Sequence, residues 1–468
     1  MTGFTGPACR GTIPLHKSQG AWGSVQGPAG VAAMVAEIII ITNGPGEVAT
    51  WVKPVVRQLR SELPTARLTV ALVPCPHASG HERRTIESWE QPIKVWSPTE
   101  TVRYLLGGKK PTEEPFGDFG VVLFLGGDQA FAVMMANRTG FPLFVYTETT
   151  GRWSPWVERF LASDRRAYLA LRNRRVSPRK LAMVGNLMVD AVRPNYDPNE
   201  ARQSLGLSSE APVVGLLPGS KPLKVRFITP LLLRAAELIW EEEPATQFVL
   251  HQSPFTPLSE IAEALADESL HAVTGGTGGR LVTIKDQPYI FTKGGAQIRV
   301  LGPEHHYPGM AIADLALTVP GTNTAELAIL GVPMIVALPL NRPEEIPVDG
   351  LAGQIGNLPL IGKPIKRMVV RLLANRLKYI SLPNQRAQRM ITPELKGVIG
   401  PEEVADLALA LLADSERRRA IRLDLYQAMG YPGAAAAIVS ILRESLANAA
   451  RHTPKLLPPA PQEQQESN

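Results

Sequence analysis

Short apolar runs alternate with helical patterns along most of the chain. The runs are rich in Val, Ile and Leu, which is typical of strands buried on both faces. They are Glu37–Thr42, Leu68–Val73, Val121–Leu125, Leu143–Tyr146, Val213–Leu217, Gln247–Leu250, Gln297–Leu301, Leu315–Val319 and Met334–Leu338. Helical spacing recurs between and after them, in Pro54–Leu63, Ile228–Glu241, Thr324–Leu330, Pro401–Leu412 and Asp414–Ala449. This alternation predicts an α/β protein whose parallel sheets are covered by helices.

A Pro/Asn-rich stretch, AVRPNYDPNEA, interrupts the pattern after Asp190. We therefore expect two Rossmann-like domains of similar size, at residues 36–190 and 191–450. Residues 1–35 have no acid and no hydrophobic period, and residues 451–468 are rich in Pro, Gln and Glu, so we expect disorder at both ends. The first segment is either a transit peptide or lies upstream of a working start at Met34, which we favour.

Composition and charge exclude some classes of protein. Two cysteines are too few for a disulfide framework or a Cys-based zinc site, and no apolar run approaches the ~18 residues that span a bilayer. The net charge of +6 suits an anionic partner. Residues 350–393 hold eight Lys or Arg and no acid. Within them, 363–389 form a basic amphipathic pattern that either lies on an anionic membrane surface or is an ordinary docked helix. Aromatic residues do not interleave with it, so specific binding of nucleic acid is not expected.

The first glycine loop, NGPGEVATW, follows a strand directly. Gly44, Gly46 and Ala49 match G-x-G-x-x-A, but no acid follows the second strand, where a Rossmann cofactor site needs one for the ribose. A turn that lets a substrate approach the backbone, with Glu47 presented at the sheet edge, is the better interpretation. The alternative is a plain turn with a solvated Glu47.

A second loop, LGGDQAF, places Asp128 at the end of another buried strand. Ligands bind at this edge of an open parallel sheet, so Asp128 is a candidate general base. The same residue is equally well interpreted as the N-cap of the helix that follows.

The loop LLPGSK opens the second domain with Gly219, Ser220 and Lys221 after a strand. Free backbone N–H groups, a hydroxyl and positive charge at a sheet edge suit an anion. The P-loop pattern is absent, so the hydrolysis of nucleoside triphosphates gains no support.

The segment VPGTNTAE ends a strand at Gly321, and Thr322 or Asn323 can cap the helix that follows. The free N–H groups at the start of a helix favour a phosphate. Glu326, one turn inside, can accept hydrogen bonds from the ribose of the same nucleotide. A mere capping arrangement is the alternative. Because the chain has no D-x-D pair, no metal is expected to hold a sugar nucleotide.

Three segments together, LLPGS, PGT-x-x-x-E-LAILGVPM and Y-x-SLPN-x-x-A-x-R, resemble lipid-A-disaccharide synthase. That family consists of inverting glycosyltransferases with the fold called GT-B, in which two Rossmann-like domains face a cleft. The resemblance implies a UDP-sugar substrate, with N-acetylglucosamine as the expected type of sugar, and no cofactor. The implied donor-binding residues are Gly219, Ser220, Lys221, Gly321, Thr322, Asn323, Glu326, Asn384 and Arg389. It also implies a cytoplasmic enzyme, peripheral on the inner face of a membrane, that glycosylates a lipid or glycolipid.

The first half of the chain departs from the family. Its G-E-x-S-G-D loop appears here as GEVATW, and its D-x-x-D-F-N segment is reduced to GGDQAF. Gly44, Gly46 and Trp51 are assigned to the acceptor side, with Asp128 as the expected base and Glu47 as the second choice. Two rivals stay open: a UDP-sugar 2-epimerase with the same donor site, and a non-catalytic binder of anionic membrane or nucleic acid.

Overall fold

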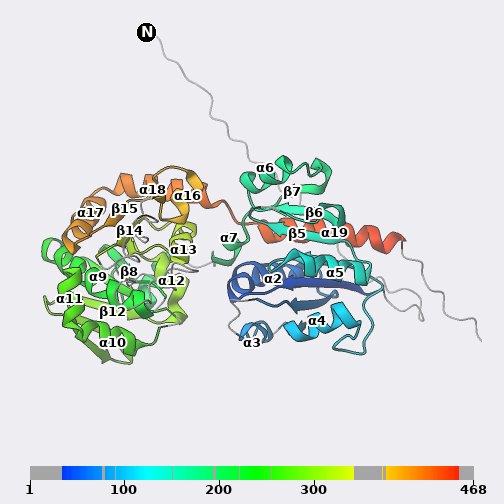
Figure 1. Cartoon of the computed structure of the whole chain (residues 1–468). Coiled ribbons are helices and arrows are strands. Elements are labelled where there is room, and N and C mark those ends of the chain that lie inside the picture. Colours follow the sequence, from blue (N-terminus) through cyan, green and yellow to red (C-terminus); the bar gives the residue numbers. More distant parts are fainter. Residues whose placement is uncertain are drawn as a thin grey trace, which may run out of the picture.

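The computed structural model describes residues 34–75, 80–89, 91–149, 151–192, 197–220, 222–253, 256–341, 372 and 376–452. Two α/β bodies lie side by side and are joined through α7 (Leu187–Val192) and the approach to α19 (Ala434–His452) (Figure 1). Lys221, residues 363–371 and 373–375 of the basic stretch 363–389, and nearly all of both terminal segments lie outside the described residues.

The first body is built on a seven-stranded sheet in the order β3-β2-β1-β4-β5-β6-β7, in which all the described pairings are parallel. In β1, Ile38 and Ile40 enter the core on one face and Ile39 and Ile41 the core on the other, which explains the unbroken apolar run. The strands are β1 (Ala36–Thr42), β2 (Arg67–Leu72), β3 (Ile93–Trp96), β4 (Phe119–Phe124), β5 (Leu143–Thr147), β6 (Val157–Ala162) and β7 (Leu181–Met183).

Helices cover both faces of this sheet. Their N-termini follow the strand ends, so the loops after β1 and β4 open at the carboxyl edge. The helical segments are α1 (Pro45–Glu47), η1 (Val48–Val52), α2 (Lys53–Glu62), α3 (Glu82–Glu87), α4 (Pro98–Gly107), α5 (Gln129–Thr139), η2 (Ser154–Trp156), α6 (Arg165–Asn173), η3 (Pro178–Lys180) and α7 (Leu187–Val192).

The second body holds an eight-stranded sheet in the order β10-β11-β12-β9-β8-β13-β14-β15. The strands are β8 (Val213–Leu217), β9 (Gln247–His251), β10 (Gly279–Ile284), β11 (Gln287–Thr292), β12 (Gln297–Leu301), β13 (Leu315–Thr318), β14 (Met334–Pro339) and β15 (Glu394–Gly397). The prediction of a parallel sheet is wrong at one end, because β11 pairs antiparallel with β10 and β12. A two-residue turn, Lys285–Asp286, closes the hairpin with φ of 49° and 62°.

Most helices of this body pack around one large core, and α8 packs into a smaller one. They are α8 (Pro198–Ser204), α9 (Pro222–Glu242), α10 (Leu258–Ala266), α11 (Glu268–Thr274), η4 (Pro303–His305), α12 (His306–Ala311), α13 (Thr322–Leu330), α16 (Leu382–Ala387), α17 (Pro401–Ala413) and α18 (Ser415–Met429).

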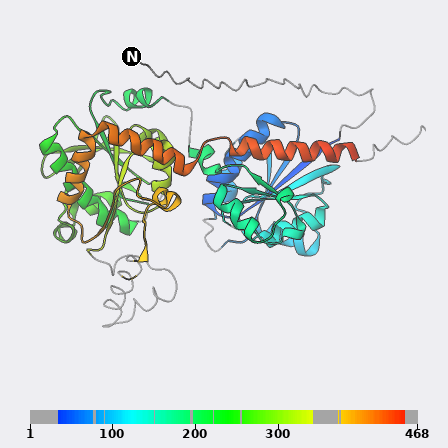
Figure 2. The same ribbon diagram turned by 90° about the horizontal axis from the view of Figure 1, so that it is seen from above.

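The last helix, α19 (Ala434–His452), crosses back and packs on the first body, as the view from above shows (Figure 2). Ile438, Val439 and Leu442 are fully buried in a core of the first sheet. This corrects the expectation that all the closing helices belong to the second domain. The Asp190 carboxylate fixes the return by accepting hydrogen bonds from the N–H groups of Gly433 and Ala435, both at 2.6 Å.

One described stretch, Ser415–His452, is long and apolar enough to cross a membrane by length and composition alone, which the sequence did not lead us to expect. In the structure it consists of α18 and α19, whose apolar faces lie in two different hydrophobic cores. Packing therefore accounts for part of its apolar character.

Candidate functional site

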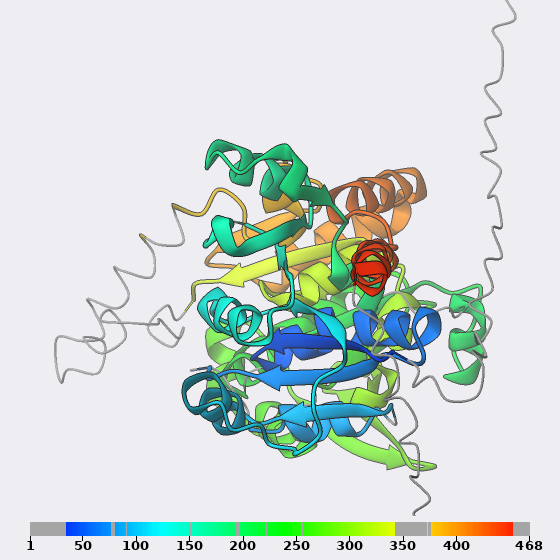
Figure 3. The same ribbon diagram turned by 90° about the vertical axis from the view of Figure 1, so that its right-hand side faces the viewer.

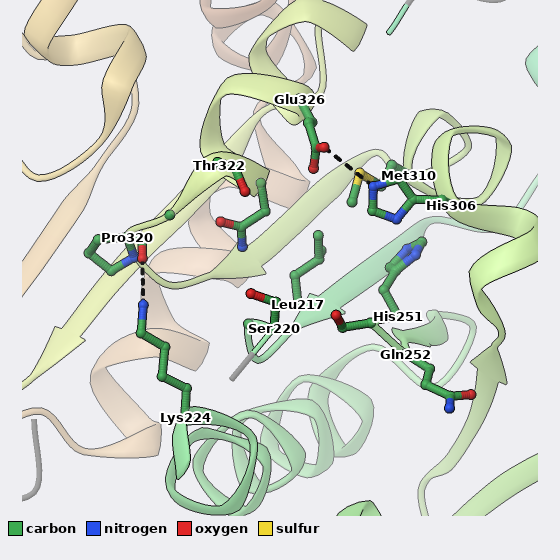
Figure 4. A pocket seen from close by; sticks show the side chains of 14 residues that line it. Leu217, Ser220, Lys224, His251, Gln252, His306, Met310, Pro320, Thr322 and Glu326 are labelled. Carbon is green, nitrogen blue, oxygen red and sulfur yellow. Dashed lines mark hydrogen bonds and ion pairs between the residues drawn. The ribbon is translucent and has the colours of Figure 1, made fainter. Parts of the chain in front are cut away.

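A pocket of about 180 Å³ opens at the carboxyl edge of the second sheet, where β8, β9 and β13 end (Figure 4). This is the edge at which ligands bind in open α/β sheets. It brings together six of the predicted donor-binding residues, Gly219, Ser220, Gly321, Thr322, Asn323 and Glu326, with Leu217, Lys224, His251, Gln252, Ser253, His306, Met310 and Pro320.

The start of α13 forms one wall of the pocket. The helix begins at Thr322 after Gly321, which has no side chain to cap it, so the expected alternative of a Thr or Asn cap is not what the structure has. Asn323 instead donates its side-chain amide to the Thr318 hydroxyl, and the Thr324 hydroxyl donates to the Gly321 carbonyl at 2.8 Å. The helix therefore presents backbone N–H groups and the positive end of its dipole to the pocket.

Glu326 lies one turn inside α13 with its carboxylate directed into the pocket (Figure 4). Its side chain is 13% exposed, and its Oε1 lies 3.4 Å from Nε2 of His306 in α12. Burial, and secondly the charge of Glu326, raise the pKa of the neighbouring Tyr307 hydroxyl. A carboxylate held by one histidine at a pocket wall keeps acceptor capacity for a ligand's hydroxyl groups.

The loop after β8 faces α13 across the pocket. Gly219 has a φ of 108°, and a Cβ there would lie 3.3 Å from Cδ of Lys224 and 3.4 Å from Cγ2 of Val319. Glycine is therefore required by the backbone conformation. Nζ of Lys224 donates to the Pro320 carbonyl at 3.0 Å, which places a positive charge beside the start of α13. Lys224 was not among the predicted donor-binding residues, and the predicted Lys221 lies outside the described residues.

His251, at the end of β9, was not predicted as a site residue. It is 7% exposed, and its Nε2 has no hydrogen-bond partner among the described residues. Burial, and secondly the charge of His306, lower the pKa of His251 to about 3. The imidazole is therefore neutral near pH 7. Its position at the end of a strand was the available signal, but a single histidine there also fits an ordinary core residue.

Asn384 and Arg389 do not reach this pocket. Asn384 is fully buried, and its side chain makes four hydrogen bonds, to Ile391, Thr392 and Glu394. Arg389 is exposed and pairs with Asp424 at 2.6 Å. It borders a separate cavity of about 320 Å³ between the two bodies.

In the first body the two predicted loops meet. A Cβ on Gly126 would lie 2.9 Å from Cγ of Glu47, and one on Gly44 would lie 2.7 Å from Oε2 of Glu47, so this side chain packs between the two glycine loops. Gly46 is exposed in the short α1. Asp128 is exposed and caps α5, because its Oδ1 accepts a hydrogen bond from the Ala130 N–H at 2.9 Å. The cap interpretation is thus confirmed, and the cap uses one of the two carboxylate oxygens.

Trp51 packs edge-on against Tyr146, with ring centroids 5.3 Å apart, at the rim of the hydrophobic core. A carboxylate that the sequence did not single out, Glu148, follows β5 and pairs with Arg386 of the second body at 3.6 Å. Burial raises the pKa of Glu148 even though Arg386 opposes the shift. The contact joins the two bodies at the same edge of the first sheet that carries Glu47 and Asp128.

Comparison with known proteins supports the resemblance seen in the motifs. No family model matches the chain. A lipid-A-disaccharide synthase of Syntrophus aciditrophicus is 29% identical over 259 residues, which is 54% of this chain and 55% of that protein. A second, of Paraburkholderia phymatum, is 31% identical over 240 residues, 51% of this chain and 49% of that protein. The chain is similar to lipid-A-disaccharide synthases. It spans about half the length of these curated relatives in the matched regions.

A UDP-GlcNAc 2-epimerase of Neisseria meningitidis, solved with UDP-GlcNAc bound, has the same fold. The TM-score is 0.51 at 12% identity, over 87% of this chain and 100% of that one. At this identity the likeness concerns the fold alone. It confirms the predicted two-domain α/β architecture of the GT-B type, with the second sheet mixed at its edge.

Proposed function

We propose that this protein is a glycosyltransferase that moves a sugar from a UDP-sugar to a lipid or glycolipid acceptor with inversion. The observation that carries the proposal is the pocket at the start of α13, where backbone N–H groups and Glu326 face one cavity of about 180 Å³. The similarity to lipid-A-disaccharide synthases supports the same reading. An N-acetylglucosamine-type sugar and a role in lipid A synthesis are the finer parts of the proposal.

The diphosphate of the donor would lie at the start of α13, near Lys224 and the amides of the loop at Gly219 and Ser220. These groups stabilise the negative charge that grows on UDP as the bond to the anomeric carbon breaks. Glu326 would accept hydrogen bonds from the ribose. No metal is proposed for this step, because backbone amides and a lysine would bind the diphosphate. Activity should therefore persist in EDTA.

The acceptor hydroxyl would attack from the first body in a single displacement. Asp128, on the carboxyl edge of that sheet, is the proposed base, and Glu47 is the second choice. Gly44, Gly46 and Trp51 stay assigned to the acceptor side as a proposal. The enzyme would act in the cytoplasm at the inner face of a membrane, where a lipid acceptor is available.

One experiment tests the activity and its rival together. Radiolabelled UDP-sugars, with UDP-N-acetylglucosamine first, are incubated with the full chain in the presence and absence of a lipid extract of the source cell. Label in the lipid phase that depends on the extract supports the transferase. Epimerised sugar nucleotide formed without any lipid identifies a 2-epimerase instead. If calorimetry shows no binding of UDP, both the transferase and the epimerase are contradicted, and a non-catalytic binder of anionic membrane or nucleic acid remains.

A further inference from the structure

One edge of the first body carries charge that the proposed reaction does not use. Residues 151–183 contain nine Arg or Lys but only two acids, Glu158 and Asp164. The chain has 49 basic and 43 acidic residues, so the part outside this stretch has 40 basic and 41 acidic residues. This segment of 33 residues therefore carries a net charge of +7, close to the +8 of residues 350–393, of which the structure describes only a part.

The segment forms the outermost part of the first sheet. It runs through η2, β6, α6, η3 and β7, and β7 is the edge strand, at the opposite end of the sheet from β3 (Figures 1 and 3). In α6, Ala167 and Leu171 pack into the core. Leu169 and Arg172, at positions i and i+3, share an exposed face of that helix. Arg165 and Arg166, at its start, are exposed as well but line the cavity between the two bodies.

Seven arginines of this edge are exposed: Arg152, Arg165, Arg166, Arg172, Arg174, Arg175 and Arg179. Among the described residues, these arginines make one ion pair, between Arg166 and Asp164 at 3.8 Å. Guanidinium groups without matching carboxylates repel one another, so this positively charged surface attracts an external anion.

Large apolar side chains are exposed among these arginines. Trp153, Trp156, Leu169 and Met183 are 43%, 49%, 46% and 63% exposed. The two indole rings meet edge to face with centroids 5.6 Å apart. Trp153 has a φ of 60°, a conformation that is strained for a bulky residue. Tryptophan, leucine and arginine on one surface are typical of contact with the headgroup layer of a bilayer.

We propose that this Arg–Trp edge, the exposed side chains of residues 151–183, binds the surface of an anionic phospholipid bilayer. The arginines would also attract a single-stranded nucleic acid, but such a ligand would not bury the exposed Leu169 and Met183. The two tryptophan rings contact each other edge to face, so they do not offer two separate faces on which bases could stack. The proposal concerns a surface of the first body and does not depend on the transferase activity.

The test uses sedimentation of the full chain with vesicles of phosphatidylcholine alone or of phosphatidylcholine and phosphatidylglycerol at 7:3. Arg174→Gln, Arg175→Gln and Arg179→Gln are combined in one variant, since these side chains are exposed and make no ion pair or side-chain hydrogen bond among the described residues. The matched control combines Arg84→Gln, Arg103→Gln and Arg417→Gln, which remove the same charge from exposed positions elsewhere.

Each arginine near an anionic membrane contributes about fivefold in binding, so the first variant should bind the mixed vesicles roughly 100-fold more weakly. The control should stay within about twofold of the wild type, and Leu169→Ser should weaken binding several-fold. Equal losses in both triple variants, or equal binding to neutral vesicles, would overturn the proposal. Tighter binding to a single-stranded RNA 20-mer, unaffected by Leu169→Ser, would also overturn it. UDP titration of the same variants reports separately on the donor pocket.

Discussion

Replacing Glu326 by glutamine is the sharpest test of the donor pocket. The side chain is 13% exposed, and its partner in the structure is His306 at 3.4 Å. Glutamine has nearly the same shape and keeps one acceptor oxygen, so the pocket should remain intact. The change removes the charge that strengthens a hydrogen bond to a ribose hydroxyl.

The expected loss follows from the strength of such bonds. A hydrogen bond to a charged group contributes about 1.5–3 kcal/mol and a neutral one about 0.5–1.5 kcal/mol. The difference, about 1–2 kcal/mol, corresponds to a Kd for UDP that rises roughly 5- to 30-fold, measured by calorimetry. Glu304→Gln is the matched control, because Glu304 is a 67% exposed carboxylate that lies 3.7 Å from His305 and does not line the pocket.

A double cycle with 2′-deoxy-UDP identifies the contact itself. If Glu326 bonds to the 2′-hydroxyl, Glu326→Gln should cost much less with the deoxy nucleotide than with UDP, giving a coupling of about 1 kcal/mol. A coupling of zero, with equal losses for both nucleotides, refutes the ribose assignment. A loss of the same size in Glu304→Gln shows that the effect is one of net charge.

Three further outcomes are expected. Asp128→Asn should abolish transfer and leave the Kd for UDP within a few fold, because Asn also caps α5; unchanged turnover excludes Asp128 as the base. Gly219→Ala should cost about 1–2 kcal/mol of stability and weaken UDP binding, since alanine is strained at a φ of 108°; an unchanged urea midpoint argues against this. Because burial lowers the pKa of His251 to about 3, the unfolded chain gains a proton below pH 6.5 that the folded chain does not, so stability should fall as the pH drops from 6.5 toward 3. Urea unfolding at pH 7 and pH 5 should differ by about 2 kcal/mol more in the wild type than in His251→Asn, and equal differences would count against the buried neutral imidazole.

Most of the strands that could be found from the sequence have both faces buried, and β12, with an exposed Gln297, is an exception. All nine predicted strands are present, because a short, unbroken apolar run such as the one in β1 is compatible with few structures other than a buried strand. The strands missed are short or carry polar residues: β3, β6, β7, β15 and the hairpin of β10 and β11. In β10 most residues are partly or fully exposed, and the turn at Lys285–Asp286 has no glycine to mark it.

Part of the candidate site could also be predicted from the positions of residues at the ends of buried strands. The loops at Gly219 and Gly321 were expected to meet, because neighbouring parallel strands end at one edge, and they do. His251 and His306 were missed because a lone histidine at the end of a strand or the start of a helix has no pattern to distinguish it. Glu148 was missed because its significance depends on Arg386, which is far away in the sequence and belongs to the other body.

The motif SLPN shows how a resemblance can identify a unit without giving the role of each member. Asn384 is saturated by four hydrogen bonds and closes the turn that leads to β15. The same turn reaches α13, since the Leu382 N–H donates to the Thr324 hydroxyl at 3.3 Å, and that hydroxyl donates to the carbonyl of Gly321. Asn384 therefore holds the turn whose Leu382 contacts the start of α13, and we expect it to affect the pocket only through this contact. A change at Asn384 should consequently lower stability together with UDP affinity, whereas a change at Glu326 should lower the affinity alone.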